Sequence, residues 1–154
     1  MDAKTYMIWF KKKQEYTPED IPDKDFLFTR IHKLNVSKGL PKADAFKNTP
    51  FNVNSNELSS DWEKYTTAKK CRDCVRFHSK PGKPEKNPND YFIWKMNVGK
   101  IRKDLIPTQD VLHSPSRHNR AHATIKGRKP ANEDVNNAEF RSIIIEIGQW
   151  AIAP

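Results

Sequence analysis

A stripe of apolar residues near the C-terminus limits the fold of this chain more than any other feature. Its members recur at i, i+3, i+4, i+7, i+10 and i+11, and they are Phe140, Ile143, Ile144, Ile147, Trp150 and Ala151. This spacing places the side chains on one face of an α-helix, which Asn136 or Asn137 is suited to cap. Because a helix must bury its apolar face against another layer, we expect this helix to lie across a sheet as its main cover.

Several short segments have the patterns of strands. Tyr6–Phe10, Phe26–His32 and Tyr91–Met96 are bulky and largely apolar, as buried strands are. Val111–Leu112 and Ala121–Lys126 flank a polar turn, and the second of them alternates apolar with polar residues like a hairpin arm. We therefore expect an α+β fold. A small mixed or antiparallel sheet would be covered by the C-terminal amphipathic helix and a second helix, and would use the segments around Ile8, Phe28, Ile93, Leu112 and Ala123.

The second helix is predicted at about Ala68 to His78, with Thr67 at its start. Its apolar face carries Cys71, Cys74, Val75 and His78 at i, i+3, i+4 and i+7. The two cysteines and His78 also have the composition of half a zinc site, but no second CxxC motif follows. Core packing of both cysteines is therefore favoured. We expect no metal and no cofactor, although a site completed by His78 and a later histidine stays open.

Two shorter helical turns are also expected. Thr17 has the properties of an N-cap and is followed by a proline in the first turn. Ser60 is suited to cap a second turn, in which three apolar residues recur at i, i+4 and i+7, namely Leu58, Trp62 and Tyr65.

The length of the chain, 154 residues, suits one domain with a core of its own. We expect a single domain over residues 1–154 with long polar loops at about 35–56 and 79–90, where prolines and glycines interrupt every periodic pattern. No apolar run of transmembrane length and no signal-peptide pattern is present. Two cysteines suit a reducing compartment. A cytoplasmic protein without membrane contact is the resulting expectation.

Positive charge is concentrated in two stretches of the sequence. The formal net charge is +9, and lysines and arginines outnumber acids in Thr67–Lys86 and in Val111–Pro130. Basic clusters of this kind favour contact with a polyanion, although lysine-rich loops also keep small proteins soluble.

The most chemically dense segment runs from Asp110 to Gly127 and holds three of the five histidines. Its hydroxyl, amide, imidazole and guanidinium groups suit phosphate oxygens, and Trp62, Tyr65, Phe77 or Tyr91, if exposed, would stack a base. Arg30 and His32 join the set because they form the polar end of a predicted strand. We therefore expect binding of a nucleic acid or phosphorylated ligand through Arg30, His32, Ser114, Arg117, His118, Asn119, Arg120, Lys126, Arg128 and Lys129.

Two other functions stay open at this point. His113 and His122 lie on the two arms of the predicted hairpin, and two imidazoles on opposite sides of a phosphate serve as general base and general acid. This pair predicts a metal-independent, RNase-like enzyme that cleaves phosphodiesters. The other alternative is a small accessory subunit whose aromatic-rich face docks on a larger protein. Whether the strand with Arg30 and His32 lies beside the hairpin decides whether the scattered basic residues form one site.

Overall fold

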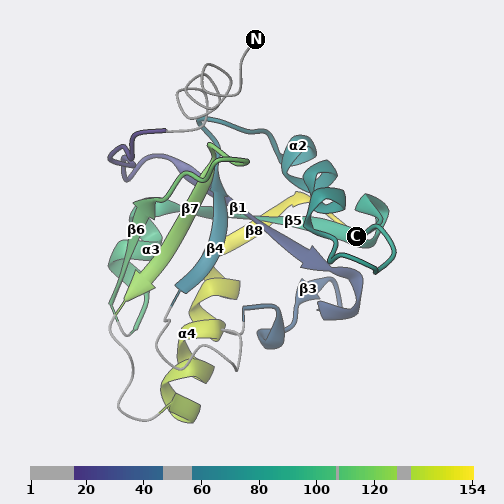
Figure 1. Cartoon of the computed structure of the whole chain (residues 1–154). Coiled ribbons are helices and arrows are strands. Elements are labelled where there is room, and N and C mark those ends of the chain that lie inside the picture. Colours follow the sequence, from purple (N-terminus) through teal and green to yellow (C-terminus); the bar gives the residue numbers. More distant parts are fainter. Residues whose placement is uncertain (1–15, 47–56, 107, 128–132) are drawn as a thin grey trace.

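The computed structural model describes residues 16–46, 57–106, 108–127 and 133–154. The fold is α+β, with a six-stranded antiparallel sheet and three α-helices in these ranges (Figure 1). This result confirms the expected class. Tyr6–Phe10, and with it the predicted strand around Ile8, lies outside the described residues, and the single domain over 1–154 stays a prediction.

The main sheet has the strand order β6-β7-β4-β1-β5-β8, and every neighbouring pair is antiparallel. Its strands are Phe26–His32 (β1), Glu57–Trp62 (β4), Tyr91–Asn97 (β5), Gln109–His113 (β6), His122–Gly127 (β7) and Gly148–Ile152 (β8). The strands Val36–Ser37 (β2) and Leu40–Pro41 (β3) pair in a separate two-stranded sheet. The α-helices are Ala68–Asp73 (α2), Val98–Asp104 (α3) and Glu133–Ile147 (α4). The 3₁₀ helices are Lys33–Asn35 (η1), Ala43–Phe46 (η2), Cys74–His78 (η3) and Pro88–Asp90 (η4).

Alternation along β1 separates the two faces of the sheet. Leu27 and Ile31 belong to the larger core cluster, together with Ile144 of α4. Phe28 faces the other way and packs in a smaller cluster with Cys71 of α2. Figure 1 accordingly shows α2 and α4 on opposite sides of the sheet. Arg30 is two residues after Phe28 on the strand, so its side chain lies on the same face of the sheet, toward α2.

The central strand β4 replaces the helical turn that was predicted around Ser60. Leu58 and Trp62 are four residues apart, and a spacing of four places two side chains on one face of a strand as well as of a helix. Both residues pack in the larger cluster, so the apolar pattern suits either structure and the pairing with β1 and β7 decides it.

The helix predicted to start at Thr17 is also wrong, because residues 16–22 contain no helix. The backbone N–H of Glu19 donates to His113 Nδ1 over a distance of 3.0 Å. This long-range hydrogen bond ties the segment to β6, and Pro22 removes the donor that a further helical turn would need.

The C-terminal helix differs from its prediction at both ends. It begins at Glu133 rather than at Asn136 or Asn137, and after Ile147 the chain continues as the edge strand β8. Pairing with β5 holds the segment after Ile147 as a strand, and its first residue has to be glycine, because a Cβ at Gly148 would lie 2.0 Å from Trp94 Nε1. Trp150 therefore packs on Trp94 from a strand, with ring centroids 4.9 Å apart. That this helix is the main cover of the sheet stays a prediction.

The helix α2 begins as predicted, since Thr67 Oγ1 accepts the Lys70 N–H at 3.2 Å. At Cys74 the helix tightens into η3, whose three residues per turn rotate the following side chains. Cys71 is buried, as predicted, whereas Cys74 is exposed, so the core role predicted for Cys74 is wrong. No helix in the described ranges has the length and apolarity needed to cross a membrane.

Candidate functional site

A cleft of about 690 Å³ separates the helical segment α2–η3 from the turn that joins β6 to β7. Three of the chain's five histidines open into it, together with one arginine and one phenylalanine. We call it the histidine cleft, and its lining consists of Arg30, Asp61, Thr66, Cys74, Phe77, His78, Ser116, His118, Asn119 and His122. The cleft therefore collects side chains from β1, β4, η3, β7 and two connecting segments.

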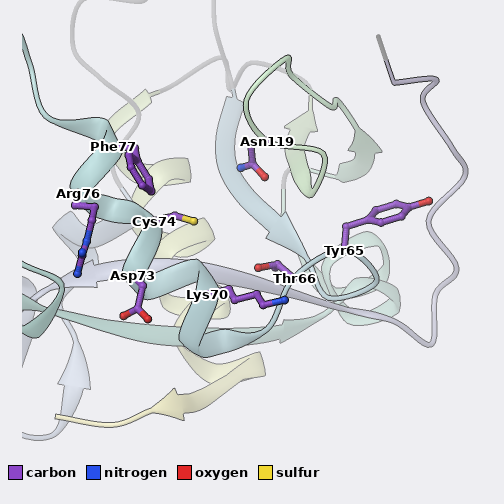
Figure 2. A pocket seen from close by; sticks show the side chains of 8 residues that line it. All are labelled: Tyr65, Thr66, Lys70, Asp73, Cys74, Arg76, Phe77 and Asn119. Atoms are coloured by element: carbon purple, nitrogen blue, oxygen red, sulfur yellow. The ribbon is translucent and has the colours of Figure 1, made fainter. Parts of the chain in front are cut away.

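A second hollow of about 380 Å³ adjoins the histidine cleft. Figure 2 shows its two walls, with Cys74 and Phe77 on the helical segment and Asn119 on the hairpin turn. Lys70 and Arg76 add positive charge to this hollow, and Asp73 adds one negative charge. Phe77 borders both cavities and is 80% exposed, an unusual exposure for so large an apolar side chain.

A buried carboxylate ties the walls of the cleft together. Asp61 Oδ2 accepts hydrogen bonds from Arg30 Nη2 at 2.7 Å and from Cys71 Sγ at 3.2 Å. Its other oxygen, Oδ1, accepts from Asn119 Nδ2 at 2.7 Å. Burial raises the pKa of the Cys71 thiol, so this group stays protonated and donates. Asp61 thus joins β1, α2 and the hairpin turn, and only 3% of it is exposed.

Arg30 completes this network from the adjacent strand. Its Nε donates to the carbonyl oxygen of Cys71 at 2.6 Å, in addition to the ion pair with Asp61. Its third nitrogen, Nη1, has no protein partner among the described residues. The guanidinium is therefore held rigidly from two sides and keeps donors for a ligand in the cleft.

The ring of His122 has a fixed orientation and a fixed proton. Nδ1 lies 2.8 Å from the carbonyl oxygen of Ser114 and 2.9 Å from Ser114 Oγ. A carbonyl only accepts, so Nδ1 carries the hydrogen. Nε2 lies 3.4 Å from Ser59 Oγ. In the neutral ring Nε2 is therefore the basic nitrogen.

The other two imidazoles of the cleft stand on facing walls. Partial burial lowers the pKa of His78, and the nearby charge of Arg30 lowers it further, while Asp61 opposes both effects. The lowered pKa favours the neutral form of His78. His118 is exposed in the turn, where the backbones of Ser116 and Asn119 pair with each other.

Part of the predicted binding set meets in this cleft. Arg30, His118 and Asn119 of this set line it together, with His122 of the predicted catalytic pair beside them, so the strand β1 and the hairpin do share one site. β4 lies between β1 and β7 in the sheet and pairs with both. Ser114 does not line the cleft but contacts His122, since its Oγ lies 2.9 Å from His122 Nδ1 and 2.6 Å from Thr124 Oγ1.

The predicted catalytic pair is not brought together. His113 pairs with Ala123, whose side chain lies in the core cluster, whereas His122 points into the cleft on the opposite face of the sheet. His113 is only 5% exposed. Its Nδ1 accepts from the Glu19 backbone, and its Nε2 donates to the Arg120 carbonyl oxygen at 2.7 Å. Both nitrogens are therefore occupied by backbone groups of the protein.

Two further predicted residues make contacts away from the cleft. The Arg120 guanidinium lies over the ring of Tyr65 at 4.2 Å and near that of Tyr16 at 5.1 Å. His32 accepts the Leu34 N–H at 3.1 Å and packs edge-on against Tyr91.

The remaining members of the predicted set do not line the cleft either. Lys126 pairs with Glu57 on the neighbouring strand at 3.3 Å, and Arg117 is an exposed residue of the turn. Arg128 and Lys129 lie outside the described residues.

Sequence reasoning missed Asp61, Thr66 and His78 as members of the site. The missing signal was the alternation along residues 57–62, which places Asp61 on the polar face once this segment is read as a strand. Within the described ranges, no group of three or more histidines, cysteines and acidic residues is arranged to hold a metal ion.

No protein-family model, curated protein or solved structure matches this chain.

Proposed function

We propose that the histidine cleft and the adjoining hollow bind single-stranded nucleic acid. The observation that carries the proposal is the position of Phe77, an exposed aromatic ring that borders both a cleft of imidazole and guanidinium groups and a hollow with Lys70 and Arg76. Exposed aromatic rings next to cationic grooves are the common design of single-strand binding sites. The net charge of +9 agrees with an anionic partner.

Phosphate groups of the strand would lie between β1 and the hairpin turn. Arg30 offers Nη1, and His118 and Asn119 offer further donors from the turn. A cleft of about 690 Å³ lies in the usual range of ligand sites. It continues into the adjoining hollow, where Lys70 and Arg76 would neutralise the next phosphate.

The ring of Phe77 favours a single strand over a duplex. An unpaired base exposes its π-face to an aromatic side chain, whereas base pairs in a duplex are stacked on one another. We therefore expect single-stranded RNA and DNA to bind more tightly than duplex DNA of the same length.

The test is a fluorescence anisotropy titration with labelled single-stranded oligonucleotides. Stacking of one base is worth about 1–3 kcal/mol, so Phe77→Ala should raise Kd by roughly 5- to 150-fold. Leu34→Ala is the matched control, because Leu34 is 70% exposed and does not line either cavity. Equal affinity of the two variants would contradict the stacking role of Phe77.

Charge is tested separately from stacking. The double variant Lys70→Ala with Arg76→Ala should make the slope of log K against log salt less negative by about 0.7 per lost phosphate contact. Lys100 and Lys103 are exposed lysines of α3, which packs into the core cluster through Val98, and their double alanine variant is the control. If wild-type protein binds no oligonucleotide at low salt, the proposal is wrong and docking on a protein becomes the better explanation of the exposed ring.

A further inference from the structure

We propose that His78 and His122 act as general base and general acid in the cleavage of RNA bound in the histidine cleft. This inference rests on the proposed function, because it needs a strand in the cleft, and it adds a reaction to that binding. It also replaces the pair of His113 and His122, which the sheet separates.

The two rings approach one space from different walls. His78 lies on η3 and His122 on β7, and both line the histidine cleft with Arg30. A phosphodiester between the rings would thus meet one imidazole on each side and the Arg30 guanidinium at its oxygens, the arrangement that acid–base catalysis requires.

The surroundings of each ring decide its role. Burial and the charge of Arg30 keep the pKa of His78 low and the ring neutral, so that it can accept a proton. His122 donates its Nδ1 hydrogen to the Ser114 carbonyl oxygen. This bond is kept when the ring is protonated, so the imidazolium has its second N–H, at Nε2, available as the acid.

The step balances without a co-reactant. The ribose 2′-oxygen attacks phosphorus while its proton passes to His78, and the bond from phosphorus to the 5′-oxygen breaks. His122 supplies the proton that the leaving 5′-oxygen takes up. The products are a 2′,3′-cyclic phosphate and a free 5′-hydroxyl, and exchange of protons with water restores both rings.

The experiment compares one sequence as single-stranded RNA and as the all-deoxy strand. Wild-type protein should bind both and cut only the RNA, leaving 2′,3′-cyclic phosphate ends. His78→Ala and His122→Ala should each slow cutting by about 100-fold or more, a loss much larger than the increase in Kd for the deoxy strand. His32→Ala is the control, because His32 lies outside the cleft and caps η1.

A second substrate separates the acid from a residue that only supports the fold. Uridine 3′-(p-nitrophenyl phosphate) has a leaving group that departs without a proton. On this substrate His122→Ala should regain most of the wild-type rate, while His78→Ala stays slow. An equal loss on both substrates would overturn the assignment of His122 as the acid.

The outcomes distinguish the inference from the function on which it rests. Binding of both strands without cutting would overturn the inference and leave the binding proposal intact. Absence of binding would overturn both. Cutting that continues in both histidine variants would also overturn the inference, since it would then come from another group.

Discussion

The buried carboxylate of Asp61 gives the sharpest prediction about stability. In Asp61→Asn one acceptor oxygen becomes an NH₂ donor, yet all three side chains that contact the carboxylate, those of Arg30, Cys71 and Asn119, donate to it. The substitution therefore places a donor against a donor and leaves the Arg30 guanidinium without its counter-charge in a mostly buried position. Breaking a buried ion pair by removal of one partner costs roughly 3–5 kcal/mol.

Glu57→Gln provides the matched control on the same strand and the same face. The ion pair of Glu57 with Lys126 is exposed on both sides, so its loss should change the free energy of unfolding by about 0–1 kcal/mol. Both substitutions remove one negative charge from β4, and they differ in burial.

The assay is urea unfolding followed by tryptophan fluorescence, for which the buried Trp62 beside Asp61 is a reporter. Thermal melting should agree, with a decrease in Tm of roughly 6–20 °C for Asp61→Asn, because 1 kcal/mol corresponds to about 2–4 °C in a chain of this size. If Asp61→Asn is no less stable than Glu57→Gln, the reasoning about the buried network is refuted.

Three further predictions concern single side chains. Iodoacetamide should modify Cys74 in the native protein and spare Cys71, whose thiol is buried and has a raised pKa, and peptide mass analysis that found equal labelling would contradict this. His113→Ala should lower the free energy of unfolding by roughly 2–4 kcal/mol, because two backbone groups lose their partner and a buried ring is removed, while affinity for an oligonucleotide in the cleft stays within about threefold. The pKa of His78 is lower in the folded than in the unfolded protein, so the unfolded state binds more protons just below its pKa of about 6.5. Stability should therefore be complete above that pH and fall as the pH decreases through the folded pKa, and His78→Gln should flatten this dependence in unfolding curves measured from pH 5 to 8.

Local sequence patterns were sufficient to predict the elements whose two faces differ clearly in their side chains. Phe26–His32 is β1 with the predicted bounds, and β6 and β7 form the predicted hairpin, since bulk and alternation along these segments agree with their pairing. The start of α2 at Thr67 was also predicted correctly, because an N-cap side chain bonds a backbone N–H within the first turn of its own helix.

Elements that depend on distant contacts could not be predicted in the same way. The spacing of the apolar residues from Phe140 to Ala151 suits a helix throughout, yet the last part of this stretch pairs with β5 as β8. Similarly, the pattern in residues 57–62 suits a helix or a strand, and only the pairing with two neighbours makes it β4.

Because a helical turn was predicted in place of β4, the site could not be recognised from the sequence. Arg30 and the hairpin are neighbours because β4 lies between β1 and β7, and Asp61 of that strand holds Arg30 and Asn119 in place. Without β4, the sequence pattern indicated that the hairpin is important but paired His122 with His113, which lies on the other face of the sheet. No local pattern relates η3 to the hairpin turn on the opposite wall of the cleft.

The most direct test of the central claim is a nuclear magnetic resonance titration of isotope-labelled protein with a single-stranded deoxyoligonucleotide. If the strand lies in the histidine cleft, the ring signals of Phe77, His118 and His122 and the side-chain amide of Asn119 should shift together, and those of His32 and His113 should stay unchanged. Shifts that gather around Tyr16 and Arg120 instead, or an absence of shifts at low salt, would contradict the account.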